Sequence, residues 1–577
     1  MARPSTLTID QSWTHLRISY CEDTTPTNDC PEYYAGDDLN PSSVACAGHG
    51  SPPTYHYSNY KTIAEKDGSY WKLMNNGETY SVINGGQIKT NGKTGVTLNF
   101  DSSGGKLHFT SNDTITVNTT GNGIVQVEGT SGTINTTSAS KFDLSAGSNI
   151  TITGLVSGNN EITLGSSNHI TTGSGADDII IDGASNTVDA GNGANVITVH
   201  GGSNKITTGT DADHITIDGA SNTVNAGNGD NVITVHGGSN KITTGANSDD
   251  ITIDGASNTV DAGNGANVIT VSGNTNKITT GTDADNITVT GNDNKVEAGN
   301  GANIVTVSGD RNDILSGTDV DNITIDGASN TVNAGNGDNI ITVHGGSNKI
   351  TTGTDADNIT IDGASNTVNA GNGDNQITVS GGDHNSIVSG NGKDTISVSG
   401  DSITVNSGDN NDSVTASGNS DIINAGDGND SVTMTGNSNT VNAGNGDDHV
   451  TISGSDNKID AGNGDNEVTI SGDKNSITSG TGKDTISISS GDSITVNSGA
   501  GDDNITANGN SDIIDAGDGN NGITIGSGDH NSIVSGNGKD TISVSGDSIT
   551  VNSGDNNDSI TASGNSDIIN AGDGNDS

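Results

Sequence analysis

The sequence predicts an all-β protein, a right-handed parallel β-roll or β-solenoid with 18-residue coils, preceded by a small irregular β-rich N-terminal region. Glycine recurs every 18 residues over most of the chain, as at Gly173, Gly191 and Gly209. Short runs rich in Val, Ile and Thr alternate with clusters of Gly, Asn and Asp. The 577 residues include 86 Gly but only 6 Pro and 2% aromatic residues, which is too few large apolar side chains for an ordinary globular core.

The N-terminal part departs from this repeat. Residues 1–60 hold all three cysteines and all six prolines, and we expect a small leader or separate module there. An odd number of cysteines allows one disulfide and leaves its existence and its partners open. Residues 61–136 carry irregular strand patterns and are predicted to form a β cap over the first coil. The solenoid is assigned to residues 137–577, with regular coils beginning between Thr137 and Gly173.

One repeat is predicted to be one coil of two strands and two turns. The turn 190–195 precedes the strand 196–199, and the turn 200–204 precedes the strand 205–208. Runs this short, β-branched and bounded by Gly and Asn are typical of strands. A single coil cannot bury its apolar side chains, but stacked coils can. The expected inward ladder contains Ile197, Ile206, Ile215 and Val224.

Charge and the chain ends limit the class of protein. The formal net charge is −51, which disfavours a nucleic-acid partner because phosphate binding needs positive charge. No apolar run is long enough to span a bilayer, and the N-terminus lacks the apolar stretch of a secretory signal. The sequence stops inside a repeat at Ser577. We therefore expect a fragment of a longer protein whose export signal is not included.

The best-preserved turn is Ala425-Gly-Asp-Gly-Asn-Asp-Ser-Val-Thr433. It resembles the G-G-x-G-x-D-x-U-x nonapeptide of the repeats-in-toxin, or hemolysin-type calcium-binding, family, with Ala425 in place of the first glycine. The resemblance covers roughly residues 170–577. It implies Ca²⁺ held between stacked turns by aspartate and backbone carbonyls. It also implies a secreted or cell-surface, bacterial rod that folds outside the cell, as a surface, adhesin or matrix protein or as the stalk of a toxin or enzyme.

The residue types of this turn suit calcium on chemical grounds as well. Gly426 and Gly428 permit the strained backbone that turns carbonyl oxygens toward one point, and Asp430 adds a hard anionic oxygen. The predicted calcium ligands at this position of the repeat are Asp177, Asp213, Asp249, Asp285, Asp321, Asp357, Asp394, Asp412, Asp430, Asp448, Asp484, Asp503, Asp540, Asp558 and Asp576.

Asparagine replaces aspartate in alternate coils, as at Asn195 and Asn231, so the earlier sites carry less charge. Extra acids at the second-glycine position, such as Asp211, are expected to compensate in part. Consecutive coils carry aspartate from Asp394 to Asp448, and this region is predicted to bind calcium most tightly. Stacked carboxylates without a cation would repel one another along the column.

The opposite edge carries asparagine instead, as at Asn186, Asn204 and Asn222. We expect a hydrogen-bonded Asn ladder there and no calcium, except at Asp421, Asp512 and Asp567. Two alternatives to a calcium-binding protein stay open. One is a metal-independent structural β-helix, and the other is an ice-binding solenoid that uses the outward column of threonines typified by Thr198.

The sequence predicts no enzyme within this chain. It contains no H-E-x-x-H zinc helix, no G-x-S-x-G nucleophile turn and no phosphate-binding loop in which Lys follows Gly. His200, His236 and His344 recur because the repeat recurs, and they are interpreted as exposed residues at strand ends. A catalytic domain outside the fragment is compatible with this interpretation.

Overall fold

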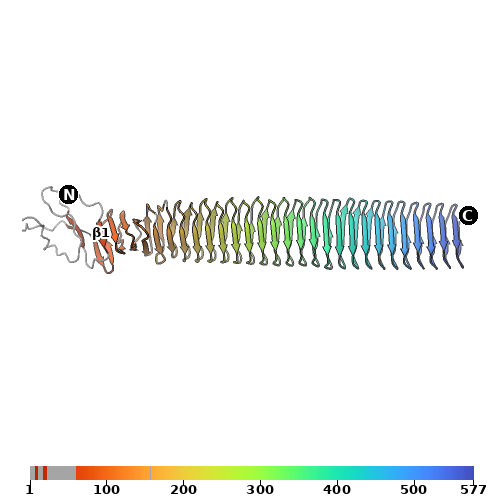
Figure 1. The fold of residues 1–577 in the computed structure, drawn as a ribbon, viewed down its shortest axis with the longest axis horizontal. Coiled ribbons are helices and arrows are strands. Elements are labelled where there is room, and N and C mark those ends of the chain that lie inside the picture. Colours follow the sequence, from red (N-terminus) through yellow and green to blue (C-terminus); the bar gives the residue numbers. More distant parts are fainter. Residues whose placement is uncertain (1–6, 11–16, 22–59, 139, 156–157) are drawn as a thin grey trace, which may run out of the picture. The chain divides into compact units, whose positions relative to one another are not determined.

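The computed structural model describes residues 7–10, 17–21, 60–138, 140–155 and 158–577. These residues form 59 strands and no helix, in two compact units, residues 1–280 (unit 1) and 281–577 (unit 2). Within each unit the strands stack in parallel as successive coils of about 18 residues (Figure 1). The predicted all-β parallel solenoid is therefore confirmed. Nothing in the described residues forms a helix long and apolar enough to cross a membrane.

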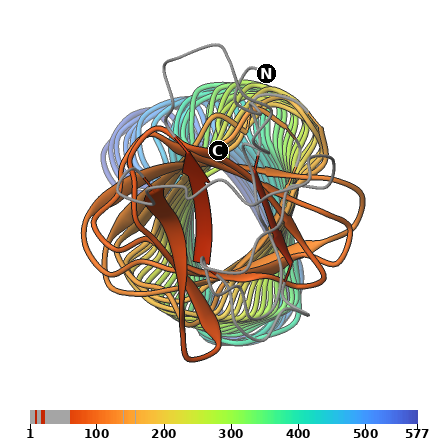
Figure 2. The same ribbon diagram turned by 90° about the vertical axis from the view of Figure 1, so that its left-hand side faces the viewer.

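Antiparallel strands precede the coils of unit 1. β2 (Arg17–Cys21) pairs antiparallel with β3 (Tyr60–Asp67), and β3 pairs antiparallel with β4 (Tyr70–Leu73). These strands lie at the N-terminal end of the stack (Figure 2). Most of the predicted Cys- and Pro-containing segment, including Cys30 and Cys46, lies outside the described residues, and so does the expected disulfide.

Parallel stacking begins earlier than the sequence predicted. β5 (Thr79–Ile83) pairs with β7 (Val96–Phe100), which pairs with β9 (Asp113–Thr119). β9 then pairs with β11 (Gly132–Asn135). All four lie within the segment for which an irregular cap was expected. Their burial alternates from residue to residue like that of the later strands, although variable turn lengths hide the glycine period.

A regular coil of unit 1 contains one strand from each of two sheets. β16 (Asp178–Ile181) and β18 (Val196–Val199) pair in one sheet, and β17 (Thr187–Gly191) and β19 (Lys205–Thr208) pair in the other. Residues 18 apart are partners, as Ile179 and Ile197 are. Every second side chain points inward, and the predicted ladder from Ile197 to Val224 is buried.

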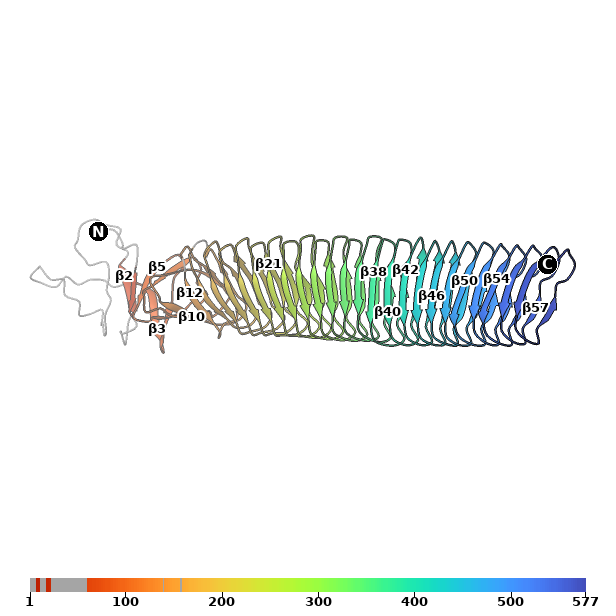
Figure 3. The same ribbon diagram turned by 45° about the vertical axis from the view of Figure 1, so that its right-hand side comes forward.

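Unit 2 repeats this arrangement (Figure 3). β43 (Ile422–Asp427) pairs with β45 (Thr440–Asn445), which pairs with β47 (Lys458–Gly462). Ile423, Val441 and Ile459 are aligned partners and are fully buried. Because a coil contributes so few apolar side chains, burial depends on the coils above and below. The same stacking places equivalent turn residues directly over one another.

Candidate metal site in the buried Asp and Asn column

The aspartates predicted from the motif occupy one edge of the coil, at the turn that precedes an even-numbered strand. Their side chains are at most 2% exposed, except at Asp576, which is half-buried. Asparagines of alternate coils, such as Asn195 in unit 1 and Asn375 in unit 2, are equally buried. We call this set the Asp/Asn column. Each coil contributes one residue, either Asp or Asn, to this column.

Hydrogen bonds tie each member of the column to the preceding coil. The backbone N–H of Asn195 donates to Asp213 Oδ1 at 2.9 Å, and the N–H of Asp213 donates to Asn231 Oδ1 at 3.0 Å. In unit 2 the N–H of Asp412 donates to Asp430 Oδ1 at 2.8 Å. One side-chain oxygen in each coil therefore satisfies a buried amide, whichever of the two residues is present.

The second carboxylate oxygen is the unusual feature of the column. For many of these aspartates Oδ2 is buried and makes no hydrogen bond, and a buried polar atom without a partner is costly. The residues concerned are Asp177, Asp213, Asp249, Asp357, Asp394, Asp412, Asp430, Asp448, Asp484, Asp503 and Asp558. At Asp540, in contrast, Ser535 Oγ lies 2.7 Å from Oδ2 and 2.9 Å from the carbonyl oxygen of Ser553, so its single proton is shared between two acceptors.

The asparagine coils show what group this position favours. Asn195 Nδ2 donates to the carbonyl of Gly193 at 2.9 Å and lies 3.5 Å from that of Gly191. Asn466 Nδ2 makes the same contacts with Gly464 at 3.1 Å and Gly462 at 3.4 Å. The turn begins at the first of these two glycines, and the second glycine is its third residue. The carbonyl groups of both glycines therefore face the Nδ2 atom of the asparagine side chain. They attract a positively polarised N–H group, and they repel a carboxylate oxygen.

The residue five positions before each member of the Asp/Asn column differs between Asp coils and Asn coils. This correlation was missed in the sequence analysis, although it is visible in the sequence. Thr or Ser accompanies Asp and Ala accompanies Asn in Thr208/Asp213, Thr244/Asp249, Ser389/Asp394 and Ser498/Asp503 against Ala190/Asn195, Ala226/Asn231 and Ala461/Asn466. The Thr208 hydroxyl lies near the Asp213 carboxyl, but it donates its single proton to the Ala226 carbonyl at 2.7 Å.

Asp430 and Asp448 break this coupling. The residues five positions before them are Ala425 and Ala443, so neither carboxylate has a hydroxyl beside it. The third turn residue in the Asp430 coil is Gly428, whose carbonyl accepts no hydrogen bond from the described residues. An unpartnered carboxylate oxygen and an unpartnered carbonyl therefore belong to the same turn.

Burial also changes the acidity of the column. It raises the pKa of Asp412 and of Asp448 to about 7, with neighbouring carboxylates adding to the effect, and it raises that of Asp357 to about 6. Desolvation penalises the charged form of a buried acid unless a cation or donors compensate. The pKa of Asp430 is raised for the same reason.

The opposite edge forms the predicted Asn ladder. The backbone N–H of Asn186 donates to Asn204 Oδ1 at 2.7 Å, and that of Asn204 donates to Asn222 Oδ1 at 2.8 Å. Two exceptions foreseen from the sequence, Asp421 and Asp512, take the same position and leave Oδ2 without a partner. Burial raises the pKa of Asp512 to about 6.

The extra acids of the turns lie outside the column. Asp211 is exposed and accepts the N–H of Gly193 at 2.7 Å, and Asp355 accepts that of Gly337 at 2.9 Å. They support the backbone of the preceding turn and are not directed into the buried position. Among the described residues, no three His, Cys, Asp or Glu side chains converge on one point as a metal cluster would. Any cation in the column must take most of its ligands from backbone carbonyls.

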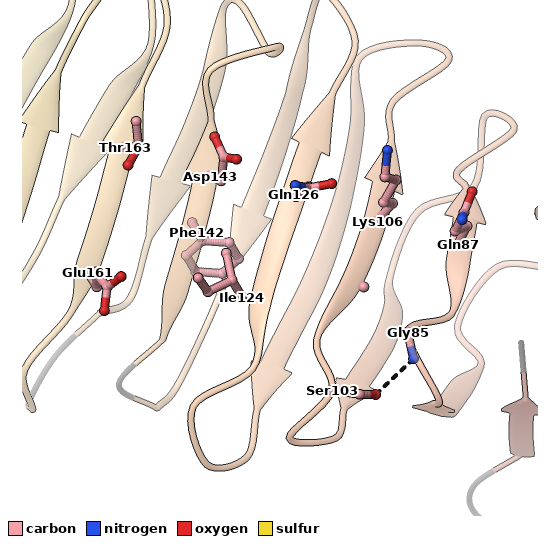
Figure 4. Close-up of a pocket in the computed structure, with 11 residues that line it drawn as sticks. Gly85, Gln87, Ser103, Lys106, Ile124, Gln126, Phe142, Asp143, Glu161 and Thr163 are labelled. Atoms are coloured by element: carbon pink, nitrogen blue, oxygen red, sulfur yellow. Dashed lines mark hydrogen bonds between the residues drawn. The ribbon is translucent and has the colours of Figure 1, made fainter.

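A shallow cavity of about 390 Å³ lies on the outer face of unit 1 (Figure 4). Polar side chains of successive strands line it, among them Gln87, Lys106, Gln126 and Asp143. Lys106 Nζ lies 3.5 Å from Glu128 Oε1. None of the residues that the sequence predicts to bind a ligand lines this cavity. The Asp/Asn column is therefore the candidate site, because it contains the predicted residues and has buried oxygen atoms without partners.

Comparison with known proteins adds little about function. Residues 253–311 and 447–493 match a family described as "Protein of unknown function (DUF3060)". Both segments consist of solenoid coils. No curated protein and no solved structure matches the chain.

Proposed function

We propose that the protein binds calcium ions in the Asp/Asn column, most tightly in the coils of Asp430 and Asp448. The observation that carries this proposal is that Oδ2 of both residues is buried without a partner or a neighbouring hydroxyl. A buried carboxylate in that state is destabilising unless its charge is compensated. A bound cation compensates it. Burial raises the pKa of both carboxyls, and nearby carboxylates add to the effect.

The donor set favours calcium over softer metals. The groups available in the Asp430 coil are Asp430 Oδ2 and the carbonyls of Gly426 and Gly428, which correspond to the carbonyls that receive N–H groups from Asn466 in its own coil. Ca²⁺ takes six to eight such oxygen ligands with tolerant geometry. No sulfur or imidazole of the described residues belongs to the column, so zinc has little to bind there. The ion would supply the positive charge that the amide supplies in an asparagine coil.

Calcium binding would make the solenoid's stability depend on its environment. A ligand that binds only the folded chain stabilises it in proportion to the logarithm of its concentration. With a net charge of −51, the chain gains most where divalent cations are abundant, as they are outside cells. We therefore place the protein outside the cell, as a calcium-stabilised surface, adhesin or matrix protein or as the stalk of a secreted toxin or enzyme.

One observation favours a metal-independent solenoid instead. The Asn ladder satisfies the buried backbone N–H groups of its members from Asn168 onward without any cation, and the inward ladder of Val and Ile is complete. The ice-binding alternative gains no such support, because Val196 and His200 flank the outward Thr198 where paired threonines would be needed. A calcium-binding solenoid and a metal-independent solenoid differ in what happens when calcium is removed.

Circular dichroism during a calcium titration separates these functions. We expect the metal-depleted protein to lose β signal and to recover it as calcium is added. Replacement of Asp394, Asp412, Asp430 and Asp448 by Ala should remove most of this response, because it removes the buried carboxylates on four consecutive coils.

A matched control replaces Asp374, Asp409, Asp427 and Asp447 by Ala. Asp409, Asp427 and Asp447 lie on the coils of Asp412, Asp430 and Asp448, and Asp374 lies on the coil before Asp394. All four are exposed, and the change in net charge is identical. We expect the control to retain the calcium response. A metal-depleted wild-type protein that is fully folded and unresponsive to calcium would refute calcium binding and support the metal-independent solenoid.

A further inference from the structure

One nine-residue sequence, Thr-Val-Asn-Ala-Gly-Asn-Gly-Asp-Asn, occurs three times in the solenoid, at residues 223–231, 331–339 and 367–375. Each copy contains one Asn-Gly pair, and these pairs are Asn228-Gly229, Asn336-Gly337 and Asn372-Gly373. All three asparagines are exposed in the turn. Because the local sequence is identical, any chemical difference between the pairs has to come from the neighbouring coil.

An Asn-Gly pair can react with itself without an enzyme, and asparagine is one of the thermolabile residues of proteins. The glycine nitrogen loses its proton and attacks the asparagine Cγ. The new C–N bond closes a five-membered succinimide, and Nδ2 leaves as ammonia with that proton. Water then opens the ring at either carbonyl and gives aspartate or isoaspartate. Glycine favours the attack because it has no Cβ to hinder it.

The group that accepts the glycine N–H differs between two of the identical turns. The N–H of Gly337 donates to Asp355 Oδ2 at 2.9 Å, whereas that of Gly229 donates to Asn247 Oδ1 at 3.2 Å. A carboxylate makes the stronger, charge-assisted hydrogen bond, and its negative charge opposes loss of the amide proton. The neutral and more distant amide of Asn247 restrains the Gly229 nitrogen less.

Asn247 replaces an aspartate that the repeat carries 36 residues before and after it, at Asp211 and Asp283. Asp211 Oδ2 accepts the N–H of Gly193, in another Asn-Gly pair, at 2.7 Å. In the third identical copy, the N–H of Gly373 donates to a backbone carbonyl of the next coil at 2.8 Å. Among the three identical turns, that of Asn228 therefore has the longest hydrogen bond to the reacting nitrogen.

We propose that Asn228 is a site of spontaneous deamidation, and that Asp355 protects Asn336 from the same reaction. Protection requires no contact with the asparagine itself, because the carboxylate acts on the nitrogen that would attack it. The extra acids of the turns thus have a chemical role in addition to supporting the backbone. This inference does not rest on calcium binding.

Deamidation at Asn228 would disturb a turn that has little spare room. A Cβ added to the adjacent Gly227 would lie 2.0 Å from the carbonyl oxygen of Gly209 on the preceding coil. Isoaspartate lengthens the main chain by one methylene beside this contact. The change would also reach the Asp/Asn column, because Asn231 Nδ2 donates to the Gly229 carbonyl at 2.9 Å.

Peptide mass spectrometry tests the proposal on the folded full-length protein during incubation in mildly alkaline buffer. Trypsin places the two turns in different peptides, residues 206–241 and 312–349. We expect Asn228 to be converted about tenfold faster than Asn336, as the difference between a neutral and a charged hydrogen bond implies. Asn247→Asp should slow the reaction of Asn228 to the rate of Asn336, and Asp355→Asn should have the reverse effect at Asn336.

Asp362→Asn provides the matched control. It removes the same charge from an exposed residue on the coil of Asp355, and it should leave the rate at Asn336 unchanged. In denaturant, Asn228 and Asn336 should react equally fast, because their surrounding sequences are identical. Equal rates in the folded protein would overturn the proposal. An unchanged rate at Asn336 in Asp355→Asn, or unequal rates in the unfolded chain, would overturn it as well.

Discussion

Aspartate and asparagine have nearly the same shape, yet they have opposite effects at one atom of the Asp/Asn column. Both use Oδ1 to accept a backbone N–H from the preceding coil. The second group then faces the turn carbonyls, where Nδ2 of Asn466 donates and Oδ2 of Asp430 finds no partner. The identity of a single atom therefore determines whether a coil is complete by itself or requires a cation.

The change Asp430→Asn tests this difference. In metal-depleted buffer we expect the variant to be more stable than wild type by about 1–3 kcal/mol, because an amide satisfies the carbonyls that a carboxylate repels. Chemical denaturation measures the difference. Asp427→Asn, at an exposed residue of the same turn, removes the same charge and should have little effect. A variant at Asp430 that is less stable without metal would contradict our account of the site.

At the scale of the turn, glycine is required because the coils stack so closely. Gly426 has φ 106°, and a Cβ added there would lie 1.8 Å from the carbonyl oxygen of Gly408 on the preceding coil. Gly381 has the same φ of 106° with no atom within 4 Å of such a Cβ. These two glycines separate backbone strain from steric exclusion within one unit.

We expect Gly381→Ala to cost about 1–3 kcal/mol, the usual range for strained backbone. Gly426→Ala should cost more, because the turn must also move away from its neighbour and the carbonyls of the proposed calcium site move with it. Thermal unfolding in calcium, combined with a calcium titration, measures both effects. Equal costs at the two positions would show that strain alone explains the requirement for glycine.

At the scale of the whole molecule, the buried carboxylates link stability to pH. Burial raises the pKa of Asp412 and Asp448 to about 7, whereas an unfolded aspartate has a pKa of about 3.9. The folded state therefore binds more protons than the unfolded state between these values. By linkage, the free energy of unfolding must fall as pH rises through this range when no metal is bound.

Without metal, the solenoid should thus be most stable near pH 4 and lose stability toward pH 7, a range of about three pH units. Saturating calcium should remove most of this dependence near pH 7, because the bound ion takes the place of the protons. Thermal melting across this range, with and without calcium, measures the effect. Stability that rises with pH in metal-depleted protein would contradict buried, uncompensated carboxylates.

The sequence by itself determined the coil and its columns. When the period of the sequence equals the length of a coil, residues one period apart must lie over one another, which is why the Ile197 ladder, the Asn ladder and the Asp/Asn column could all be predicted. The early coils from Thr79 onward could not, because turns of unequal length remove the glycine period while strand pairing keeps the coils aligned.

Only the tertiary structure decided what each stacked side chain does. It showed that Asp430 is buried with Oδ2 unpartnered, that Asp211 supports a neighbouring turn, and that the Nδ1 atoms of His200 and His236 contact aspartates of neighbouring coils. Periodicity places residues in a column, but it does not determine which lone pair or ring nitrogen is used. That choice depends on the distances between neighbouring coils and the direction of each side chain, which exist only in the folded chain.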